Sequence, residues 1–137
     1  MGIRHSCAYR VSYRDTDCMG RVYYANYLEI CERARTELLR AVGFPYRKIE
    51  DEGCFFPVRS CQVRYHGYAV YDDELICLTH LSKLSHATLT FVTEITRLDA
   101  AKPLVSAIVE LACVGRESKP RIIPVELRDA VTPYLEK

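Results

Sequence analysis

The chain has 137 residues, of which 49% are hydrophobic and 27% are charged, and its 19 basic and 18 acidic side chains leave a net charge of +1. This length is typical of one domain with its own core, so we expect a single domain over residues 1–137. The balanced charge gives no support to nucleic-acid binding, which usually needs a basic face. No apolar run approaches the roughly 18 residues of a membrane-spanning helix, so we expect no membrane association.

The seven cysteines argue against a disulfide framework and against a zinc site. Their number is odd, none forms a C-x-x-C pair, and the N-terminal residues lack the apolar core of a secretion signal. Most of them lie in apolar patterns, where cysteine acts as a small hydrophobe. We therefore predict a reduced, cytoplasmic protein without a metal or other cofactor.

The first elements in chain order are a strand and a long helix. Residues 7–13 alternate between apolar and polar side chains, which predicts a half-buried strand. Residues 24–42 predict the helix, because they carry one apolar stripe at helical spacing, formed by Tyr27, Cys31, Ala34 and Leu38. Gly43 and Pro45 then end the helix.

A short helical segment over residues 46–53 precedes a run of predicted strands. We place these strands at about 57–66, 74–84, 87–97 and 104–114. The connections between them are too short for helical crossovers, so neighbouring strands should pair antiparallel. The tail is punctuated by three prolines and should end in a short helix.

The element order also predicts an oligomer. One long helix with a single apolar stripe can cover only one face of a four- or five-stranded sheet. The strands predicted at 74–84 and 104–114 carry apolar residues on both faces. No second element is long enough to cover the other face, so we expect a partner chain to do so.

The loop "DTDCMG" (15–20), which leads into the long helix, invites three interpretations. Its acids and glycine match the start of a calcium-binding loop, but that motif needs an oxygen ligand where Met19 stands and a glutamate where Asn26 stands, so calcium is rejected. Asp15 and Asp17 could instead cap turns or the helix start. Both precede the predicted helix by several residues, so neither is an obvious N-cap.

The third interpretation is catalytic. A carboxylate beside a helix N-terminus faces backbone N–H groups that have no partner inside the helix. Such groups, with the helix dipole, suit a developing oxyanion. A carboxylate on one side and donors on the other make a site for attack on a carbonyl, and Gly20 lets a ligand approach the backbone closely.

The segment "YRDTDCMGRVYYANYLEICERARTELL" (13–39) resembles the signature of hotdog-fold acyl-CoA thioesterases. It is similar to both the 4-hydroxybenzoyl-CoA branch and the Tol-Pal-associated branch of that family, in which a D-x-D-x-x-G-x-V-[YW] loop precedes a helix with Y…E-x-A-R. The later segment "PVRSCQVRYHGYAVYDDEL" (57–75) resembles the family's second signature. The resemblance implies an α+β hotdog fold, a five-stranded antiparallel sheet wrapped around one long central helix, and a homotetramer built from dimers with the active site between subunits.

The resemblance also implies roles for residues of the loop. Asp17 matches the catalytic carboxylate, acting as nucleophile or as general base on water. Tyr24 matches the position whose backbone N–H polarises the thioester carbonyl. Gly20, Val22 and Tyr23 match substrate-binding residues that shape the site. Asp15 matches a recurrent loop residue, which we expect to hold the geometry of the loop.

Two departures from the family pattern bear on the substrate. The Tol-Pal-associated branch usually has histidine where Tyr24 stands, whereas the hydroxybenzoyl branch has tyrosine, which favours a short or aromatic acyl group. The hydroxybenzoyl branch also holds the nucleotide phosphates with paired arginines near the turn between its third and fourth strands. This chain offers Lys83 there, with Arg116 and Lys119 in the tail as alternatives.

Other assignments remain open. His80 lies within a strand pattern and is interpreted as a packed core histidine, and Cys18 has no histidine near it in sequence to activate it as a nucleophile. The rival function is a non-catalytic acyl-CoA-binding module of the same fold. The presence of Asp17 argues against that module. A hydratase of the same fold is a third option, but the paired acid and histidine motif usual in such hydratases is not visible in this sequence.

Overall fold

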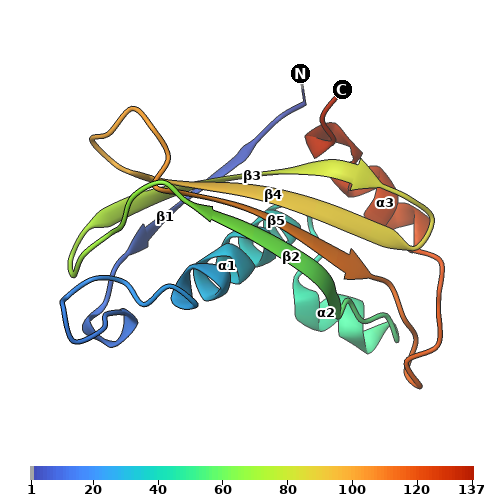
Figure 1. The fold of residues 1–137 in the computed structure, drawn as a ribbon. Coiled ribbons are helices and arrows are strands. Elements are labelled where there is room, and N and C mark those ends of the chain that lie inside the picture. Colours follow the sequence, from blue (N-terminus) through green and yellow to red (C-terminus); the bar gives the residue numbers. More distant parts are fainter. Residues whose placement is uncertain (1) are drawn as a thin grey trace.

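The computed structural model describes residues 2–137, in which a curved sheet arches over one long helix (Figure 1). The five strands are β1 (His5–Arg10), β2 (Val58–Tyr65), β3 (Glu74–Leu84), β4 (Thr88–Arg97) and β5 (Val105–Ala112). Their order across the sheet is β1-β3-β4-β5-β2, and every pair is antiparallel. The predicted hotdog architecture is therefore confirmed.

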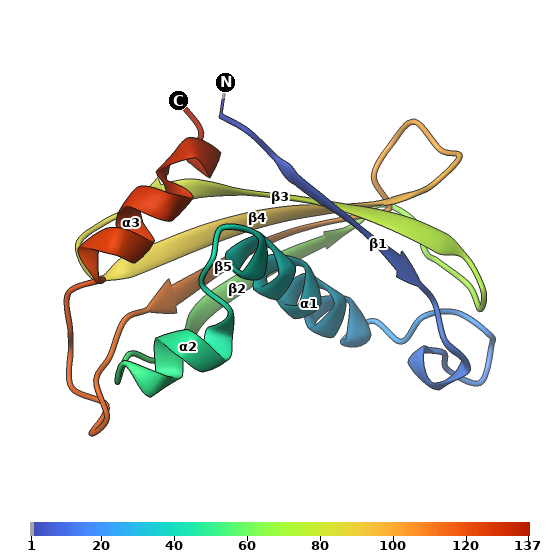
Figure 2. The same cartoon turned by 180° about the vertical axis from the view of Figure 1, so that it is seen from behind.

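The long helix α1 (Asn26–Ala41) lies along the concave face of the sheet, as Figure 2 shows from behind. The predicted apolar stripe is buried, and the buried side chains of the helix are Tyr27, Ile30, Cys31, Ala34, Leu38 and Leu39. The helix begins two residues later than the predicted 24, because Tyr24 and Ala25 form a turn before it. It ends as predicted, since Gly43 adopts a φ of 93° that favours glycine.

The helices α2 (Tyr46–Asp51) and α3 (Val125–Val131) and the 3₁₀ turn η2 (Thr132–Tyr134) lie beyond the C-terminal end of α1. A further 3₁₀ turn, η1 (Tyr13–Asp15), lies in the loop between β1 and α1. Buried residues of α2 and α3 share one core cluster with the second half of α1 and the inner side of β3, β4 and β5. A second cluster joins the first half of α1 to β1, β3 and the loop before the helix. The short helix predicted near the end of the tail is present as α3.

Two details of the predicted strands are wrong. The first strand ends at Arg10, and Tyr13 turns outward to 79% exposure because the chain enters η1. In addition, β2 does not pair with β3, although the connection between them is short. The segment between them crosses the end of the sheet, because β3 pairs with β1 and β2 pairs with β5.

As a result β2 is an open edge strand. Seven of its eight residues are exposed, and only Val63 is partly buried. A row of unpaired backbone groups on an exposed edge is a template for pairing with another strand.

Candidate active site

The loop between β1 and α1 is fixed by the buried carboxylate of Asp15, which is only 5% exposed. One of its oxygens accepts hydrogen bonds from the hydroxyl of Tyr9 (2.7 Å) and from the backbone N–H and hydroxyl of Ser12 (2.8 and 3.0 Å). Burial and this hydrogen bond raise the pKa of Tyr9 to about 12, so Tyr9 stays a donor at neutral pH. The backbone carbonyl of Asp15 accepts the N–H of Tyr23 at 2.8 Å.

Asp17 lies at the exposed tip of the same loop. Its Oδ1 accepts the backbone N–H groups of Met19 (2.8 Å) and Arg21 (3.2 Å). Its Oδ2 makes no hydrogen bond within residues 2–137. Asp17 is therefore oriented through one of its two carboxylate oxygens. The two aspartates of the motif are thus in different environments: Asp15 is buried and accepts three hydrogen bonds, whereas Asp17 is exposed and accepts two.

Gly20 and Val22 give the loop its shape. Gly20 has a φ of 78°, and a Cβ there would meet nothing within 4 Å, so the position needs glycine for its backbone conformation and is open to a ligand. Val22 is buried, and its N–H donates to the carbonyl of Ala69 at 2.9 Å. The N–H of Ala69 in turn donates to the hydroxyl of Tyr27 in α1 at 2.9 Å.

The turn before α1 presents two backbone donors. Within the described part of the chain, neither the N–H of Tyr24 nor that of Ala25 has a hydrogen-bond acceptor. Asn26 donates its N–H to the carbonyl of Tyr23 at 2.8 Å. Because C=O and N–H point in opposite directions across a trans peptide, this bond also fixes the direction of the Tyr24 N–H.

Tyr65, at the end of β2, fixes the second donor and was missed by the sequence analysis. Its hydroxyl donates to the carbonyl of Tyr24 at 2.8 Å, which orients the peptide that carries the Ala25 N–H. Partial burial raises the pKa of Tyr65, so the hydroxyl keeps its proton. Nothing in the local pattern of β2 signals this contact, because it joins residues 41 positions apart.

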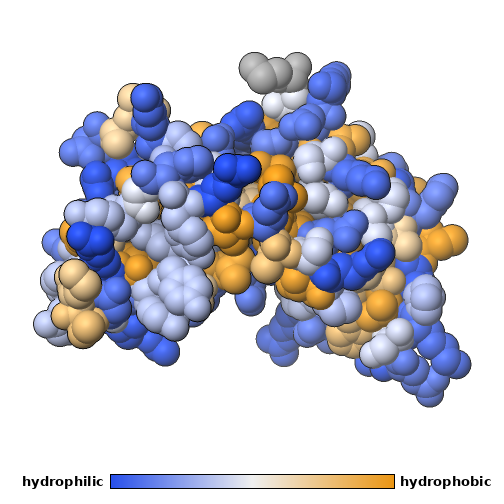
Figure 3. Space-filling view, in the orientation of Figure 1, coloured by the Kyte–Doolittle hydropathy of each residue, from blue (hydrophilic) through white to orange (hydrophobic). Residues whose placement is uncertain are grey.

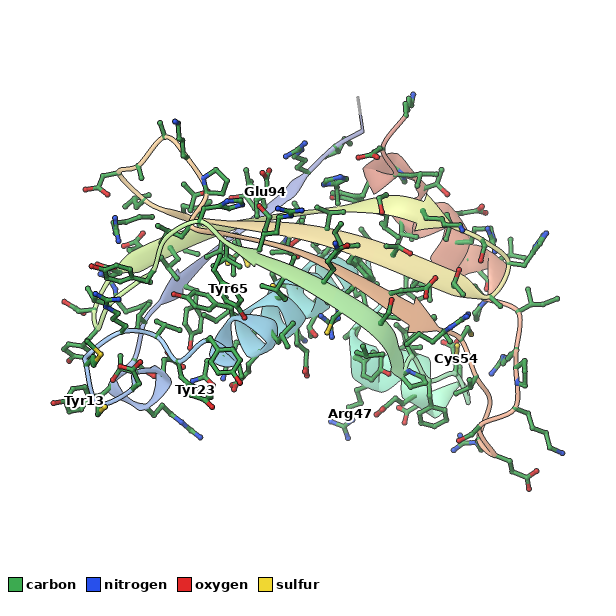
Figure 4. All side chains as sticks on the ribbon, in the orientation of Figure 1. Tyr13, Tyr23, Arg47, Cys54, Tyr65 and Glu94 are labelled. Carbon is green, nitrogen blue, oxygen red and sulfur yellow. The ribbon has the colours of Figure 1, made fainter. Side chains whose placement is uncertain are left out.

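Tyrosine rings surround these donors. Tyr24 lies 4.9 Å from Tyr23 and 6.4 Å from Tyr65, measured between ring centroids, and Tyr65 lies 5.7 Å from Tyr27. Tyr23, Tyr24 and Tyr65 are all exposed, at 46%, 63% and 46%. Figure 4 shows Tyr13, Tyr23 and Tyr65 together at the end of the molecule that carries the loop. The helix start is therefore bordered by an aromatic surface that a flat ligand can contact.

The structure does not bring the predicted cations to this loop within one chain. Lys83 lies near the end of β3, and Arg116 and Lys119 lie in the turn after β5, at the end of the sheet opposite the loop (Figure 1). Lys119 pairs with Glu117 at 3.5 Å, and Arg116 donates to the carbonyl of Asp51 at 3.3 Å. These three residues can serve a site at the loop only from another subunit.

Arg21 is a cation of the loop itself. The central carbon of its guanidinium group lies 3.9 Å from the centre of the Tyr68 ring, a cation–π contact. It stands next to Gly20 and was not singled out from the sequence, since a lone arginine in a loop carries no signal of its own.

A cavity of about 270 Å³ opens between α1, α2 and the start of β2. Apolar side chains of Leu39, Phe56, Leu89 and Leu111 line it, together with Arg35, Tyr46 and polar residues at its mouth. Arg35 has no hydrogen bond or ion pair within residues 2–137, and burial lowers its pKa. This unpaired guanidinium beside an apolar cavity was also missed, because on the sequence Arg35 is one of several charges along a helix.

His80, the other candidate considered for acid–base chemistry, has a structural role. His80 is buried and its Nε2 lies 3.0 Å from Glu136, so it belongs to the contact between β3 and the C-terminal segment. Within residues 2–137, no group of three or more His, Cys, Asp or Glu side chains is arranged to bind a metal ion. None of the described helices has the length and apolar character needed to cross a bilayer.

Known proteins are similar to this chain over most of its length. The Thioesterase-like superfamily model matches residues 11–132. The acyl-CoA thioesterase YbgC of Haemophilus influenzae is 37% identical over 123 residues, covering 88% of this chain and 89% of that protein. A probable thioesterase from Bartonella henselae has a solved structure with 36% identity and a TM-score of 0.83, covering 89% of this chain and 100% of that one.

A structure from Aquifex aeolicus, described as a hypothetical protein, has 30% identity and a TM-score of 0.88, covering 93% of this chain and 99% of that one. The family model therefore spans the loop, α1 and the strands β2 to β5. The chain belongs to the Thioesterase-like superfamily and is a thioester hydrolase with the hotdog fold.

Proposed function

We propose that this protein is a cytoplasmic acyl-CoA thioesterase in which Asp17 and the backbone N–H of Tyr24 act on the thioester carbonyl. One observation carries the proposal. A single short loop holds a carboxylate with one oxygen that has no donor among residues 2–137, and it leads into a turn where the N–H groups of Tyr24 and Ala25 have no acceptor within those residues. The activity named for the YbgC relative, which matches most of the chain, supports the choice of acyl-CoA.

In this mechanism the thioester carbonyl accepts the N–H of Tyr24, with the Ala25 N–H as a second donor. Asp17 either attacks the carbonyl carbon with Oδ2 or takes a proton from an attacking water molecule. The N–H donors stabilise the negative charge that develops on the carbonyl oxygen, and the C–S bond breaks to release the CoA thiolate. In the covalent route a water molecule then hydrolyses the anhydride formed with Asp17, and in either route the carboxylic acid is released. One such donor is worth roughly 3 to 4 kcal/mol of barrier in other enzymes. A general base adds about 100- to 10,000-fold in rate.

The exposed edge of β2 supports a dimer with shared active sites. In antiparallel pairing of β2 with β2 of a second copy, the start of one strand lies beside the end of the other. Val58, at the start, lines the mouth of the 270 Å³ cavity, and Tyr65, at the end, contacts Tyr24. Each cavity would then face the loop of the other subunit. Hydrophobic residues gather in the middle of the view in Figure 3, and exposed Val58 is among the large apolar side chains available for this contact.

The same pairing gives the distant cations a role. The backbone groups of Phe55 and Val114 exchange two hydrogen bonds of 2.9 Å, so the turn that carries Arg116 and Lys119 lies beside the start of β2. In the dimer that turn approaches the loop of the other subunit, where its charges could hold CoA phosphates. Lys83 lies farther along the same end of the sheet. Two such dimers meeting through the outer sheet face, where Ile108 is 42% exposed, would complete the tetramer.

The acyl group that fits best is short or aromatic. A cavity of about 270 Å³ is slightly smaller than typical ligand pockets, which have volumes of roughly 300 to 1,000 Å³. The guanidinium of Arg35 and the rings of Tyr23, Tyr24 and Tyr65 offer flat surfaces on which an aromatic acyl group can stack.

The test is hydrolysis of benzoyl-, butyryl- and palmitoyl-CoA by the wild type and by Asp17→Asn, with products separated by chromatography, because seven cysteines would react with a thiol dye. The turnover number (kcat) should fall at least about 100-fold in Asp17→Asn without loss of thermal stability. Asp99→Asn, which changes an exposed acid of the loop between β4 and β5, is the matched control. Turnover by Asp17→Asn above one third of wild type would refute the mechanism. Tight binding of all three esters without turnover by the wild type would favour the binding module.

A further inference from the structure

Two cysteines that are far apart in sequence meet in the core. The Sγ atoms of Cys54 and Cys113 lie 3.1 Å apart, although the residues are 59 positions apart in the chain. Both side chains are buried, at 0% and 1% exposure, in the cluster that joins α1, α2 and the sheet. Figure 4 shows Cys54 at the end of the molecule opposite Tyr13 and Tyr23, away from the catalytic loop.

The backbone on both sides of this pair is fixed by short-range structure. Gly53, with a φ of 81°, reverses the direction of the chain after α2. The N–H of Cys54 donates to the carbonyl of Ile49 at 3.2 Å. One residue farther on, Phe55 and Val114 exchange their two hydrogen bonds. Cys54 and Cys113 each precede a residue of that antiparallel bridge, so their side chains lie on the same side of it, and their sulfur atoms meet diagonally across it.

We propose that Cys54 and Cys113 form an oxidisable dithiol that closes to a disulfide when the protein meets hydrogen peroxide. The sulfur atoms need to approach by only about 1 Å to reach the disulfide bond length of roughly 2.05 Å. The site is separate from the thioesterase centre, and the proposal does not rest on the hydrolytic activity.

The chemistry balances with peroxide as the oxidant. The thiolate of one cysteine attacks the O–O bond, giving a sulfenic acid and releasing hydroxide, which takes up a proton. The second thiol attacks the sulfenic sulfur, the S–S bond forms, and a second water leaves. The two thiols lose two electrons and two protons, and one peroxide becomes two water molecules.

The surroundings make this oxidation slow. Burial, together with the hydrogen bond to Cys54, raises the pKa of Cys113 to about 12, so its reactive thiolate is scarce at neutral pH. Arg121 opposes this rise, and its N–H donates to the carbonyl of Cys113 at 3.1 Å. The exposed Cys18 and Cys61 should therefore react before the buried pair does.

The cross-link would stabilise the fold. It joins the connection between α2 and β2 to the end of β5, and it closes a loop of about 60 residues, which removes conformational freedom chiefly from the unfolded chain. The midpoint of thermal unfolding should rise by at least about 5 °C on oxidation. The same connection carries Phe56, a wall of the 270 Å³ cavity, so the cross-link also stiffens one side of that cavity.

The experiment uses the full chain with Cys7→Ser, Cys18→Ser and Cys61→Ser, which removes the two exposed thiols and the thiol of Cys7, whose pKa of about 7 would make it react first. This protein is exposed to hydrogen peroxide, alkylated in denaturant, digested without reductant and examined by mass spectrometry. We expect a linked peptide pair containing Cys54 and Cys113, a loss of two free thiols, and the rise in unfolding midpoint, all reversed by dithiothreitol. Adding Cys54→Ser to the same background should abolish all three effects.

Three results would overturn the proposal. The first is complete survival of both thiols after prolonged exposure. The second is conversion of either cysteine to sulfinic acid in place of the linked peptide. The third is an equal rise in unfolding midpoint in the variant with Cys54→Ser. If Cys54→Ser does not fold, Cys54→Ala replaces it, since alanine fits the buried site without a polar group.

Discussion

The hydroxyl of Tyr65 donates a 2.8 Å hydrogen bond to the backbone carbonyl of Tyr24. This bond ties the end of the edge strand β2 to the turn that opens α1. The carbonyl belongs to the peptide whose N–H, that of Ala25, has no acceptor within the described residues. A donor bound to a carbonyl also polarises the N–H of the same peptide, which makes that N–H a better donor. Tyr65 is thus a positioning residue for the oxyanion donors of the proposed mechanism.

Tyr65→Phe should lower kcat by about 3- to 10-fold with little change in the Michaelis constant (KM). The variant keeps the ring and its contacts with Tyr24 and Tyr27 but loses one hydrogen bond, worth roughly 0.5 to 1.5 kcal/mol. The loss appears in kcat because the donors matter most when charge develops on the carbonyl oxygen. Steady-state kinetics with the best ester of the acyl-CoA panel measures it.

Tyr71→Phe is the matched control, because Tyr71 is also an exposed tyrosine and its hydroxyl makes no hydrogen bond within residues 2–137. It should leave both constants unchanged. A rise in KM with constant kcat in Tyr65→Phe would mean that the hydroxyl contacts the substrate and does not orient the turn.

The two aspartates of the loop should respond differently to the same amide substitution. Asp15→Asn weakens three hydrogen bonds to a buried carboxylate, a loss of roughly 1.5 to 3 kcal/mol, and should lower the unfolding midpoint by about 5 to 10 °C. Asp17→Asn keeps an oxygen to accept the N–H groups of Met19 and Arg21, so its midpoint should stay within about 1 °C of wild type. Differential scanning calorimetry compares them. Equal destabilisation by both changes would make Asp17 a structural residue.

Cys61 can report on pairing of β2 with a second copy. It is exposed near the middle of Val58–Tyr65, so two-fold antiparallel pairing brings the two Cys61 side chains within reach of each other. Mild oxidation with copper phenanthroline should give a covalent dimer, and light scattering of the untreated protein should give a multiple of 15.8 kDa. Cys61→Ser should abolish the covalent dimer, whereas Cys18→Ser should keep it. A mass of 15.8 kDa in solution would contradict the shared active site.

Cys7 should be reactive near neutral pH. It lies directly opposite Cys77 across β1 and β3, beside a groove of about 490 Å³ that gives reagents access. The hydrogen bond from Cys77 lowers the pKa of Cys7 to about 7, because it stabilises the thiolate. The thiol form predominates below this pH and the reactive thiolate above it, so alkylation by iodoacetamide should rise with a midpoint near pH 7.

Peptide mapping distinguishes Cys7 from the other cysteines. Cys77→Ala removes the donor and should return the pKa towards an ordinary value of roughly 8.5, which lowers the alkylation rate at pH 7 by about 10-fold. Cys31 is an internal control, since burial raises its pKa to about 11 and should keep it unmodified. The same midpoint with and without Cys77 would show that this hydrogen bond does not tune the thiol.

Much of the fold could be read from local patterns, because those patterns have local physical causes. The apolar stripe of α1 must face a core, and Gly43 and Pro45 end the helix whatever the rest of the chain does. The errors lie where tertiary contacts overrule the pattern. Tyr13 fits the alternating pattern of the predicted strand. However, the buried carboxylate of Asp15 accepts the N–H of Ser12, and this part of the chain forms η1 instead.

The candidate site divides in the same way. Asp17, Gly20 and Tyr24 are close in sequence, so one motif could point to all of them, although their catalytic roles still await the proposed experiments. The sequence could not single out Tyr65 or Arg35 as site residues. Their contacts with Tyr24 and with the 270 Å³ cavity arise only when the folded sheet brings distant segments together. The contact between Cys54 and Cys113 is of this second kind.

The sequence by itself determined the order of one strand, a long helix and four further strands, the buried face of the helix and the loop that precedes it. These depend on spacing, turn residues and burial periodicity, which act over a few residues. The tertiary structure alone decided which aspartate is buried, which N–H groups have no acceptor among the described residues, and that β2 is an exposed edge beside β5. These features depend on strand order and on contacts between residues tens of positions apart, for which a single sequence carries no local signal.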